Sequence, residues 1–348
     1  MLDCQVHGAR DLRVTEVPRP VAGPGEVLLR LGAAGICGSD MHYYLHGGVG
    51  SFRIREPLTP GHEASAVVAD IGPGVTRVVP GNRVAVNPSR PCGHCTGCRQ
   101  GRENLCANMR FLGSASVFPH VQGMFREYFV MPESQCVPVA DSVSLEALAM
   151  SEPLSVALHS VRRGGELLGK RVLITGSGTI GCMAVLAARL AGAAEITITD
   201  VVDHPLTVAR QVGADRTVRA DSVEAGEPLF AADDTFDVAL EVSGAAPSLH
   251  TCLQAARRGG VVVQVGTLPA QGMHLMANLV MQKELDLRGS FRFGAVFEMA
   301  VAAIASGRVD VRPVLSGTHP LEQAREAIEL ATDKTRSMKV QLVASAAA

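Results

Sequence analysis

Four cysteines lie within fifteen residues of one another, at a spacing that suits a metal ion. They are Cys92, Cys95, Cys98 and Cys106, in the pattern C-x2-C-x2-C-x7-C. Four thiolates spaced in this way can enclose one tetrahedral Zn²⁺ in a closed, structural site. An iron–sulfur cluster is the competing interpretation, but no proline follows the last cysteine and the chain offers no second cluster. The total of nine cysteines is odd, which speaks against a disulfide framework, so we expect a structural zinc.

A second set of potential zinc ligands is dispersed along the chain. Cys37 lies in the run G-I-C-G-S-D, and His62 and Glu63 lie in the run P-G-H-E. A cysteine, a histidine and a carboxylate that leave one position open form the ligand pattern of catalytic zinc. The spacing alone does not bring Cys37 to His62, and an isolated cysteine is most often a small buried apolar residue. At this point a metal site and a structural interpretation are both open.

A glycine-rich turn, G-S-G-T-I-G at residues 176–181, follows the predicted apolar strand 172–175 and opens the predicted helix 179–191. The first glycine permits the tight turn, the second lets backbone amides approach a pyrophosphate, and the third lets helix and strand pack closely. The helix N-terminus also attracts the negative charge of the phosphates. This turn predicts a dinucleotide site that includes Gly176, Gly178, Thr179, Ile180 and Gly181.

An acidic residue after the next predicted strand indicates which dinucleotide is bound. Asp200 follows strand 196–199 and lies 19 residues after Gly181. A carboxylate there can bond the ribose hydroxyls and repel a 2′-phosphate, and no lysine or arginine directly follows it. We therefore expect NAD in preference to NADP. Residues near the ends of later strands complete the predicted cofactor site, namely Val242, Val265 and Gly266.

The elements around these motifs divide the chain into parts of different character. Up to about residue 150, short alternating stretches between Gly and Pro turns predict the strands of an irregular β-barrel. Beyond it, apolar strands alternate with helices, which predicts a doubly wound parallel sheet and an α/β fold. Its predicted strands are 172–175, 196–199, 236–241, 261–265 and 285–288, and its predicted helices include 179–191 and 206–212.

The composition excludes several classes of protein. Lys+Arg is 32 and Asp+Glu is 34 among 348 residues, so neither nucleic acid nor an anionic membrane is an expected partner. The most apolar stretch, 172–199, is interrupted by glycines and charges and does not predict a membrane span. The N-terminus shows no signal peptide, so we expect a cytoplasmic protein.

Taken in this order, the motifs resemble the zinc-dependent medium-chain dehydrogenases over essentially the full chain. The resemblance implies a GroES-like β-barrel catalytic domain with a structural-zinc lobe (1–150), a Rossmann NAD-binding domain (151–290) and a C-terminal return to the catalytic domain (291–348). It also implies a homo-oligomer, a tetramer or a dimer.

The same resemblance implies how a secondary alcohol is oxidised. Cys37, His62 and Glu63 correspond to the ligands of a catalytic zinc, which acidifies the substrate hydroxyl as a Lewis acid. The proton leaves through Ser39, and His42 could pass it onward. The substrate carbon gives its hydride to the nicotinamide.

Glu152, in the run S-E-P-L-S, matches the glutamate of the polyol (sorbitol) branch, which contacts the zinc directly or through its water. Its structural alternative is that of an acid in the first turn of a helix, beside Pro153. Several runs, among them R-G-S-F-R-F at 288–293, are closest to the bacterial members that oxidise the sugar acid L-idonate. The resemblance thus implies oxidation of L-idonate to 5-keto-D-gluconate, with an uncharged polyol such as sorbitol or xylitol as the alternative.

The predicted substrate contacts are Tyr43, Arg110, Phe111, Arg292 and Phe293. Sorbitol dehydrogenases generally carry tyrosine where Phe293 stands, which favours the sugar acid. The carboxylate of a sugar acid needs a fixed cation in a closed site, since leaving it unpaired costs roughly 2 kcal/mol or more. Arg292 is the first candidate for that cation and Arg110 the second.

Overall fold

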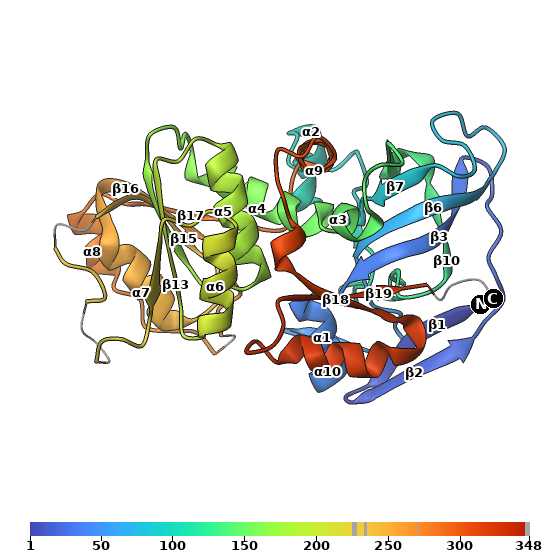
Figure 1. Cartoon of the computed structure of the whole chain (residues 1–348), viewed down its shortest axis with the longest axis horizontal. Helices are drawn as coiled ribbons and strands as arrows, with labels where there is room; N and C mark the ends of the chain where they lie inside the picture. Colours follow the sequence, from blue (N-terminus) through green and yellow to red (C-terminus); the bar gives the residue numbers. More distant parts are fainter. Residues whose placement is uncertain (225–227, 233–234, 270, 345–348) are drawn as a thin grey trace.

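A six-stranded parallel sheet forms one half of the molecule (Figure 1). The computed structural model describes residues 1–224, 228–232, 235–269 and 271–344. In spatial order the strands are β14 (Arg216–Arg219), β13 (Glu195–Asp200), β12 (Arg171–Thr175), β15 (Phe236–Glu241), β16 (Ala256–Gln264) and β17 (Asp286–Gly289). The helices that accompany the sheet are α4 (Ser151–Gly164), α5 (Thr179–Leu190), α6 (Asp203–Gln211), α7 (Ala246–Ala255) and α8 (Ala277–Gln282). Because α5 and α6 lie on one face and α7 on the other, the predicted doubly wound sheet is confirmed.

The other half is built mainly of antiparallel strands. Its main sheet runs β11 (Cys136–Val139), β7 (Arg83–Val86), β6 (Glu63–Ile71), β3 (Glu26–Gly35), β19 (Lys339–Val343) and β18 (Leu315–Pro320), and β10 (Tyr128–Pro132) also pairs with β3. The shorter pairs are β1 (Leu2–Gly8) with β2 (Asp11–Glu16), β4 (Gly48–Val49) with β5 (Phe52–Arg53), and β8 (Ser89–Arg90) with β9 (Arg110–Phe111). Its helices are α1 (Gly38–His46), α2 (Thr96–Arg99), α3 (Leu145–Ala149) and α10 (Ala324–Thr332), and α9 (Phe297–Ala305) packs between the halves, against α3 and α4.

The C-terminal strands return to the sheet of the N-terminal half. Strand β19 pairs antiparallel with β3, with Gln341 opposite Gly35. This pairing places residues some 300 positions apart in sequence next to each other, so the last strand can supply side chains to a site built by the first 65 residues.

Three details differ from the prediction. Strand β14 was not predicted, because Arg216–Arg219 is a short, half-exposed edge strand with an arginine at each end. Helix α6 starts at Asp203 and not at 206, since Pro205 is tolerated in a first helical turn. Strand β16 starts at Ala256 and not at 261, and after the buried Ala256 it continues through the exposed residues Arg257, Arg258 and Gly259.

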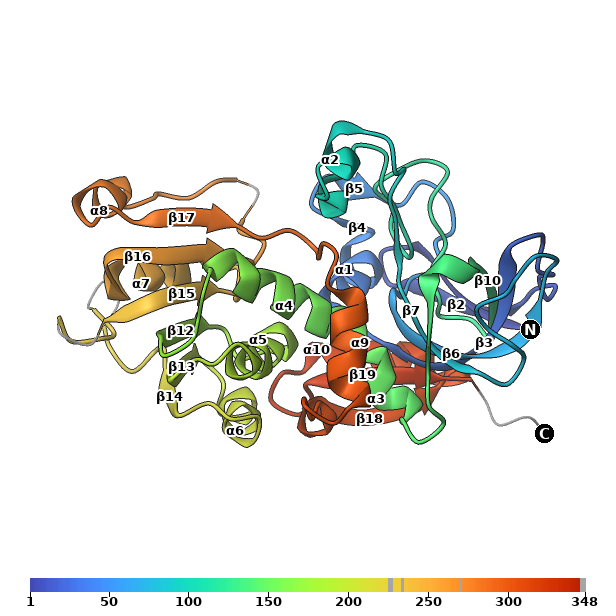
Figure 2. The same ribbon diagram turned by 90° about the horizontal axis from the view of Figure 1, so that it is seen from above.

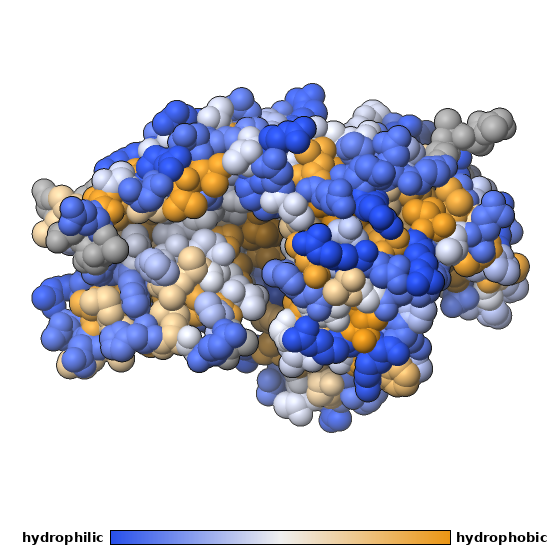
Figure 3. All heavy atoms as spheres, turned by 90° about the horizontal axis from the view of Figure 1, so that it is seen from below, coloured by the Kyte–Doolittle hydropathy of each residue, from blue (hydrophilic) through white to orange (hydrophobic). Residues whose placement is uncertain are grey.

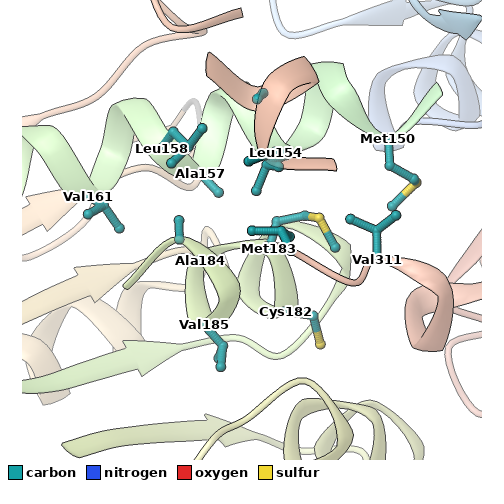
Figure 4. Packing of buried hydrophobic residues seen from close by; sticks show 14 of the residues in the cluster. Met150, Leu154, Ala157, Leu158, Val161, Cys182, Met183, Ala184, Val185 and Val311 are labelled. Atoms are coloured by element: carbon teal, nitrogen blue, oxygen red, sulfur yellow. The ribbon is translucent and has the colours of Figure 1, made fainter. Parts of the chain in front are cut away.

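Helix α4 joins the two halves, since it packs against α5 of the parallel-sheet half and also contacts β6 and α3 of the other half. Leu154, Ala157 and Val161 of α4 face Met183 and Ala184 of α5 in a buried apolar layer (Figure 4). The first turn of α4 carries Glu152, whereas α5 begins directly after the glycine-rich turn. This packing therefore fixes the distance between the two predicted functional regions.

The two halves leave a hollow between them, in which hydrophobic atoms are visible from below (Figure 3). Among the described residues, no helix combines the length and the apolar character that a bilayer span requires.

Candidate active site

Cys37, His62 and Glu63 are brought together by the pairing of β3 with β6. Gly35, the last residue of β3, lies opposite Glu63, the first residue of β6. Cys37 follows β3 by two residues and caps α1, so its thiol lies next to the histidine and the glutamate. The candidate ligand atoms of the three side chains all lie within 4.8 Å of one another. The structure thus assembles the dispersed set that the sequence left open.

Asp40 lies next to this cluster and holds its backbone in place. The sequence analysis did not assign it a role. Its side chain is fully buried and accepts hydrogen bonds from the backbone N–H groups of Cys37 (2.9 Å) and Gly61 (3.1 Å). One oxygen lies 3.7 Å from Nδ1 of His62. Burial lowers the pKa of His62, but the nearby Asp40 and Cys37 outweigh it and raise that pKa well above its usual range. A carboxylate in this position orients a metal-binding histidine.

Lys339, also unassigned by the sequence analysis, pairs with Glu63. Its ammonium donates to both carboxylate oxygens, at 2.8 and 2.6 Å, and to the carbonyl of Ile36 at 3.0 Å. Both side chains are almost completely buried. Burial lowers the pKa of Lys339, but Glu63 and Cys37 outweigh it, so the net shift is upward. An isolated lysine in an apolar strand was the only sequence signal for this residue.

A pocket of about 220 Å³ opens beside the cluster. Its lining residues are Ser39, Tyr43, Val49, Phe52, His62, Phe111, Gly113, Ser114, Glu152, Val156, Phe291 and Arg292. Glu152 is buried in the first turn of α4, and its pKa is raised to about 7, chiefly by burial. It shares the pocket wall with His62 but does not belong to the three-residue ligand cluster.

Five of the predicted catalytic and substrate-contacting residues line this pocket: Ser39, Tyr43, Phe111, Glu152 and Arg292. Three others lie elsewhere. His42 is exposed, with its ring 5.6 Å from that of His46, and Arg110 is exposed on β9. Phe293 is buried, and its ring lies 5.9 Å from that of Phe297. The structure therefore does not bring His42, Arg110 or Phe293 into the pocket.

Arg292 is the only lysine or arginine among the described residues of the pocket wall. Its guanidinium lies 4.4 Å from the ring centre of Phe111 and 5.0 Å from that of Phe291. Its backbone has a φ of +51°, a region that non-glycine residues seldom adopt. Burial lowers its pKa, although Glu152 and Tyr43 raise it. The pocket thus holds a mostly buried cation above an aromatic face.

The four cysteines of the lobe also converge, around α2. Their sulfur atoms fall within 4.8 Å of one another. The N–H of Cys92 donates to the sulfur of Cys106 at 3.2 Å, and Cys95 and Cys98 are 3.5 Å apart, sulfur to sulfur. Backbone N–H groups, first that of His94, lower the pKa of Cys92 to about 5. All four are free thiols, so the predicted ligand set is available for a metal.

Replacing Cys98 by serine is expected to remove one zinc per chain and to lower Tm, while kcat of the folded enzyme stays within about threefold, because a closed site contributes folding energy and no chemistry. Zinc analysis, thermal unfolding and initial rates measure these effects. Cys252→Ser, in a buried cysteine of α7 outside both clusters, is the matched control. An unchanged zinc content in Cys98→Ser contradicts the assignment.

The glycine-rich turn lies at the carboxyl end of β12, beside the point where strand order reverses between β12 and β15. Gly176 has a φ of +93°, and a Cβ on Gly181 would overlap the carbonyl oxygen of Gly176. A Cβ on Gly178 would meet nothing within 4 Å, so the backbone is open to a ligand there. These features fit a dinucleotide whose pyrophosphate lies at the N-terminus of α5.

Asp200 and Glu241 stabilise the turns around the candidate dinucleotide site. Asp200 ends β13 and accepts hydrogen bonds from the N–H groups of Ser177 (2.7 Å) and Val202 (3.1 Å). Glu241, which the sequence analysis did not single out, ends β15 and accepts from the hydroxyl of Ser243 and the N–H of Gly244. The other predicted cofactor residues lie at the same edge of the sheet: Thr179, Ile180, Val242, Val265 and Gly266.

Two family models match the chain. The alcohol dehydrogenase GroES-like domain matches residues 23–141, and the zinc-binding dehydrogenase matches residues 179–306.

Similar proteins extend over nearly the whole chain. L-idonate 5-dehydrogenase (NAD(P)(+)) of Escherichia coli K12 is 43% identical over 340 residues, which are 98% of this chain and 98% of that protein. Sorbitol dehydrogenase of Gallus gallus is 37% identical over 341 residues, 97% of this chain and 94% of that protein. The crystal structure of L-idonate 5-dehydrogenase from Escherichia coli K-12 is similar with a TM-score of 0.91 at 41% identity, covering 98% of this chain and 97% of that one.

Proposed function

This chain belongs to the zinc-binding alcohol dehydrogenases, in their polyol and sugar-acid branch, and from that premise we propose that it oxidises L-idonate to 5-keto-D-gluconate with NAD⁺. The observation that carries the proposal is the position of Arg292. Among the described residues, one half-buried arginine is the only lysine or arginine that shares the small pocket with the candidate metal ligand His62. A sugar acid presents both groups that such a pocket can bind, a secondary alcohol and a carboxylate.

The donor set fits a catalytic zinc. It combines one sulfur, one nitrogen and one carboxylate, with Cys37, His62 and Glu63 as the residues that would hold the ion. The buried carboxylate of Asp40, 3.7 Å from Nδ1 of His62, supports this fit, because such a carboxylate orients a metal-binding histidine. Zinc bound there supplies Lewis-acid polarisation of the substrate hydroxyl.

The chain's own residues supply orientation and a path for the proton. Ser39 lines the pocket two residues after Cys37, so its hydroxyl can relay the proton that the substrate loses, accepting it while releasing its own proton to solvent. Asp40 holds the His62 ring in place, and Phe111, 5.4 Å from that ring, limits the space beside it. Arg292 orients the far end of the substrate through its carboxylate.

Asp200 supports NAD as the preferred cofactor. A 2′-phosphate placed near its carboxylate would be repelled, whereas ribose hydroxyls can donate to it. By the same resemblance we propose a cytoplasmic homo-oligomer, a tetramer or a dimer, with one catalytic and one structural zinc per chain.

Initial rates with L-idonate and with D-sorbitol, each with NAD⁺ and NADP⁺, test the proposal. Wild type is expected to prefer L-idonate and NAD⁺. Arg292→Gln is expected to lower kcat/KM for L-idonate by at least about 10-fold and to leave D-sorbitol within about threefold, because only the acid needs the cation.

Arg308→Gln is the control, since Arg308 is an exposed arginine after α9, outside the pocket. An equal loss on both substrates in Arg292→Gln would exclude a carboxylate-specific role. A wild-type preference for D-sorbitol would instead favour sorbitol dehydrogenase, the second candidate, which the 37% identical relative supports.

A further inference from the structure

We propose that three arginines next to the substrate pocket form an entrance that attracts the carboxylate of the substrate, and that they thereby favour sugar acids over uncharged polyols. The three are Arg102, Arg162 and Arg163, hereafter the arginine vestibule. The inference rests on the proposed function, because it assumes that the substrate is an anion.

The vestibule is a large cavity with positive walls. It has a volume of about 960 Å³. Its lining comes from the cysteine lobe, the end of α4 and the residues after β16 and β17, whose arrangement Figure 2 shows from above. The lining includes Val265 and Gly266, so the cavity borders the predicted cofactor site, and among the described residues it contains no aspartate or glutamate. None of the three guanidinium groups forms an ion pair with a described residue. Three positive charges therefore face this space without a described counter-ion.

The pKa of His159 is affected by the charges of the three arginines. Its side chain lies in the same wall, and its pKa is lowered, first by burial and then by Arg163, Arg162 and Arg102. All three arginines thus act on one point in the wall. A cavity with walls of one sign concentrates ligands of the opposite sign and raises their association rate.

The vestibule adjoins the substrate pocket through one segment. Phe291 lines both cavities, and its carbonyl accepts a hydrogen bond of 3.0 Å from the side chain of Asn104 in the lobe. Arg292, the next residue, is the cation of the inner pocket. The segment that lines both cavities therefore also carries the guanidinium that is proposed to bind the carboxylate.

The polar side chains of the cavity wall differ in the bonds that they already make. Ser290 belongs to the wall, but its hydroxyl is buried, with no hydrogen-bond partner in the described part of the chain. Arg163 has a second, structural task, since its Nε donates to the carbonyl of Gly289 at 2.9 Å. Arg102 and Arg162 have no such side-chain bond among the described residues, so they can be replaced without breaking one.

The experiment compares wild type with the double variant Arg102→Gln/Arg162→Gln, on L-idonate and on D-sorbitol, at low and high salt. For wild type, kcat/KM on L-idonate is expected to fall as salt rises, whereas that on D-sorbitol stays flat. The double variant is expected to lose about 10-fold in kcat/KM on L-idonate at low salt, mostly through KM, and to lose most of the salt dependence. Arg308→Gln removes one charge outside the cavity and is the control.

Each outcome decides between the two proposals. If L-idonate is oxidised but neither salt nor the double variant changes its kcat/KM, the vestibule is refuted and the proposed function stands. If only D-sorbitol is oxidised, the proposed substrate is wrong, and inhibition of that reaction by L-idonate becomes the readout. Inhibition that weakens in the double variant then supports an anion site, and unchanged inhibition refutes it.

Discussion

Replacing Cys37 by serine is expected to lower kcat/KM by about 10³-fold or more, equivalent to about 4 kcal/mol of transition-state stabilisation, on any alcohol that the enzyme accepts. Serine retains the backbone N–H that donates to Asp40, so the cap of α1 persists. What is lost is the thiolate, one of three side chains that would hold the ion. Initial rates and zinc analysis are the measurements, and zinc is expected to fall by about one per chain.

Cys136→Ser is the matched control. Cys136 is also a cysteine of the N-terminal half, buried where Cys37 is half-buried, but it belongs to neither ligand cluster. Its replacement is expected to change stability and to leave zinc content and kcat/KM near the wild-type values. If Cys37→Ser kept both its zinc and its activity, Cys37 would not be a ligand and the catalytic assignment would be wrong.

The local part of the site could be predicted from the sequence because each motif is short. The glycine-rich turn, the cysteine run and the P-G-H-E run each carry their chemistry within a few residues. In the structure the glycine-rich turn and the P-G-H-E run lie at strand ends, and the cysteine run lies around α2. The parallel sheet could also be predicted, since buried parallel strands appear in the sequence as short apolar runs. Among its strands only β14, a polar and half-exposed edge strand, lacks such a run and was not predicted.

The partners of those motifs could not be predicted in the same way. Lys339 meets Glu63 only because β19 pairs with β3, and no local pattern encodes that pairing. The sequence ranked Arg292 before Arg110 as the candidate cation, but it could not show which of the two reaches the substrate. The fold exposes Arg110 on β9 and places the half-buried Arg292 in the pocket wall. Side-chain roles that depend on long-range contact therefore required the structure.

Lys339→Met is expected to destabilise the zinc-free protein by about 3–5 kcal/mol, because it leaves the buried carboxylate of Glu63 without its ionic partner. Both oxygens of Glu63 bond the lysine ammonium, and the two side chains are 1% and 3% exposed, so water cannot replace the lost charge. Urea unfolding of the chelated protein measures the free energy. With zinc bound the loss is expected to be smaller, since a cation next to Glu63 again balances its charge.

Two comparisons isolate the charge from the packing. Arg312→Met breaks an ion pair of similar length with Asp310, but those side chains are 77% and 48% exposed, so the loss should stay below about 1 kcal/mol. The double variant Lys339→Met/Glu63→Leu removes both charges and is expected to recover most of the stability of the zinc-free protein, because an apolar pair can replace a buried ion pair. It should nevertheless lose activity, since it also lacks a proposed zinc ligand. If the double variant were no more stable than Lys339→Met, the cost would come from packing and not from an unpaired carboxylate. Glu63 would then be held in place by the surrounding strands, and Lys339 would have no electrostatic role in presenting it to the metal.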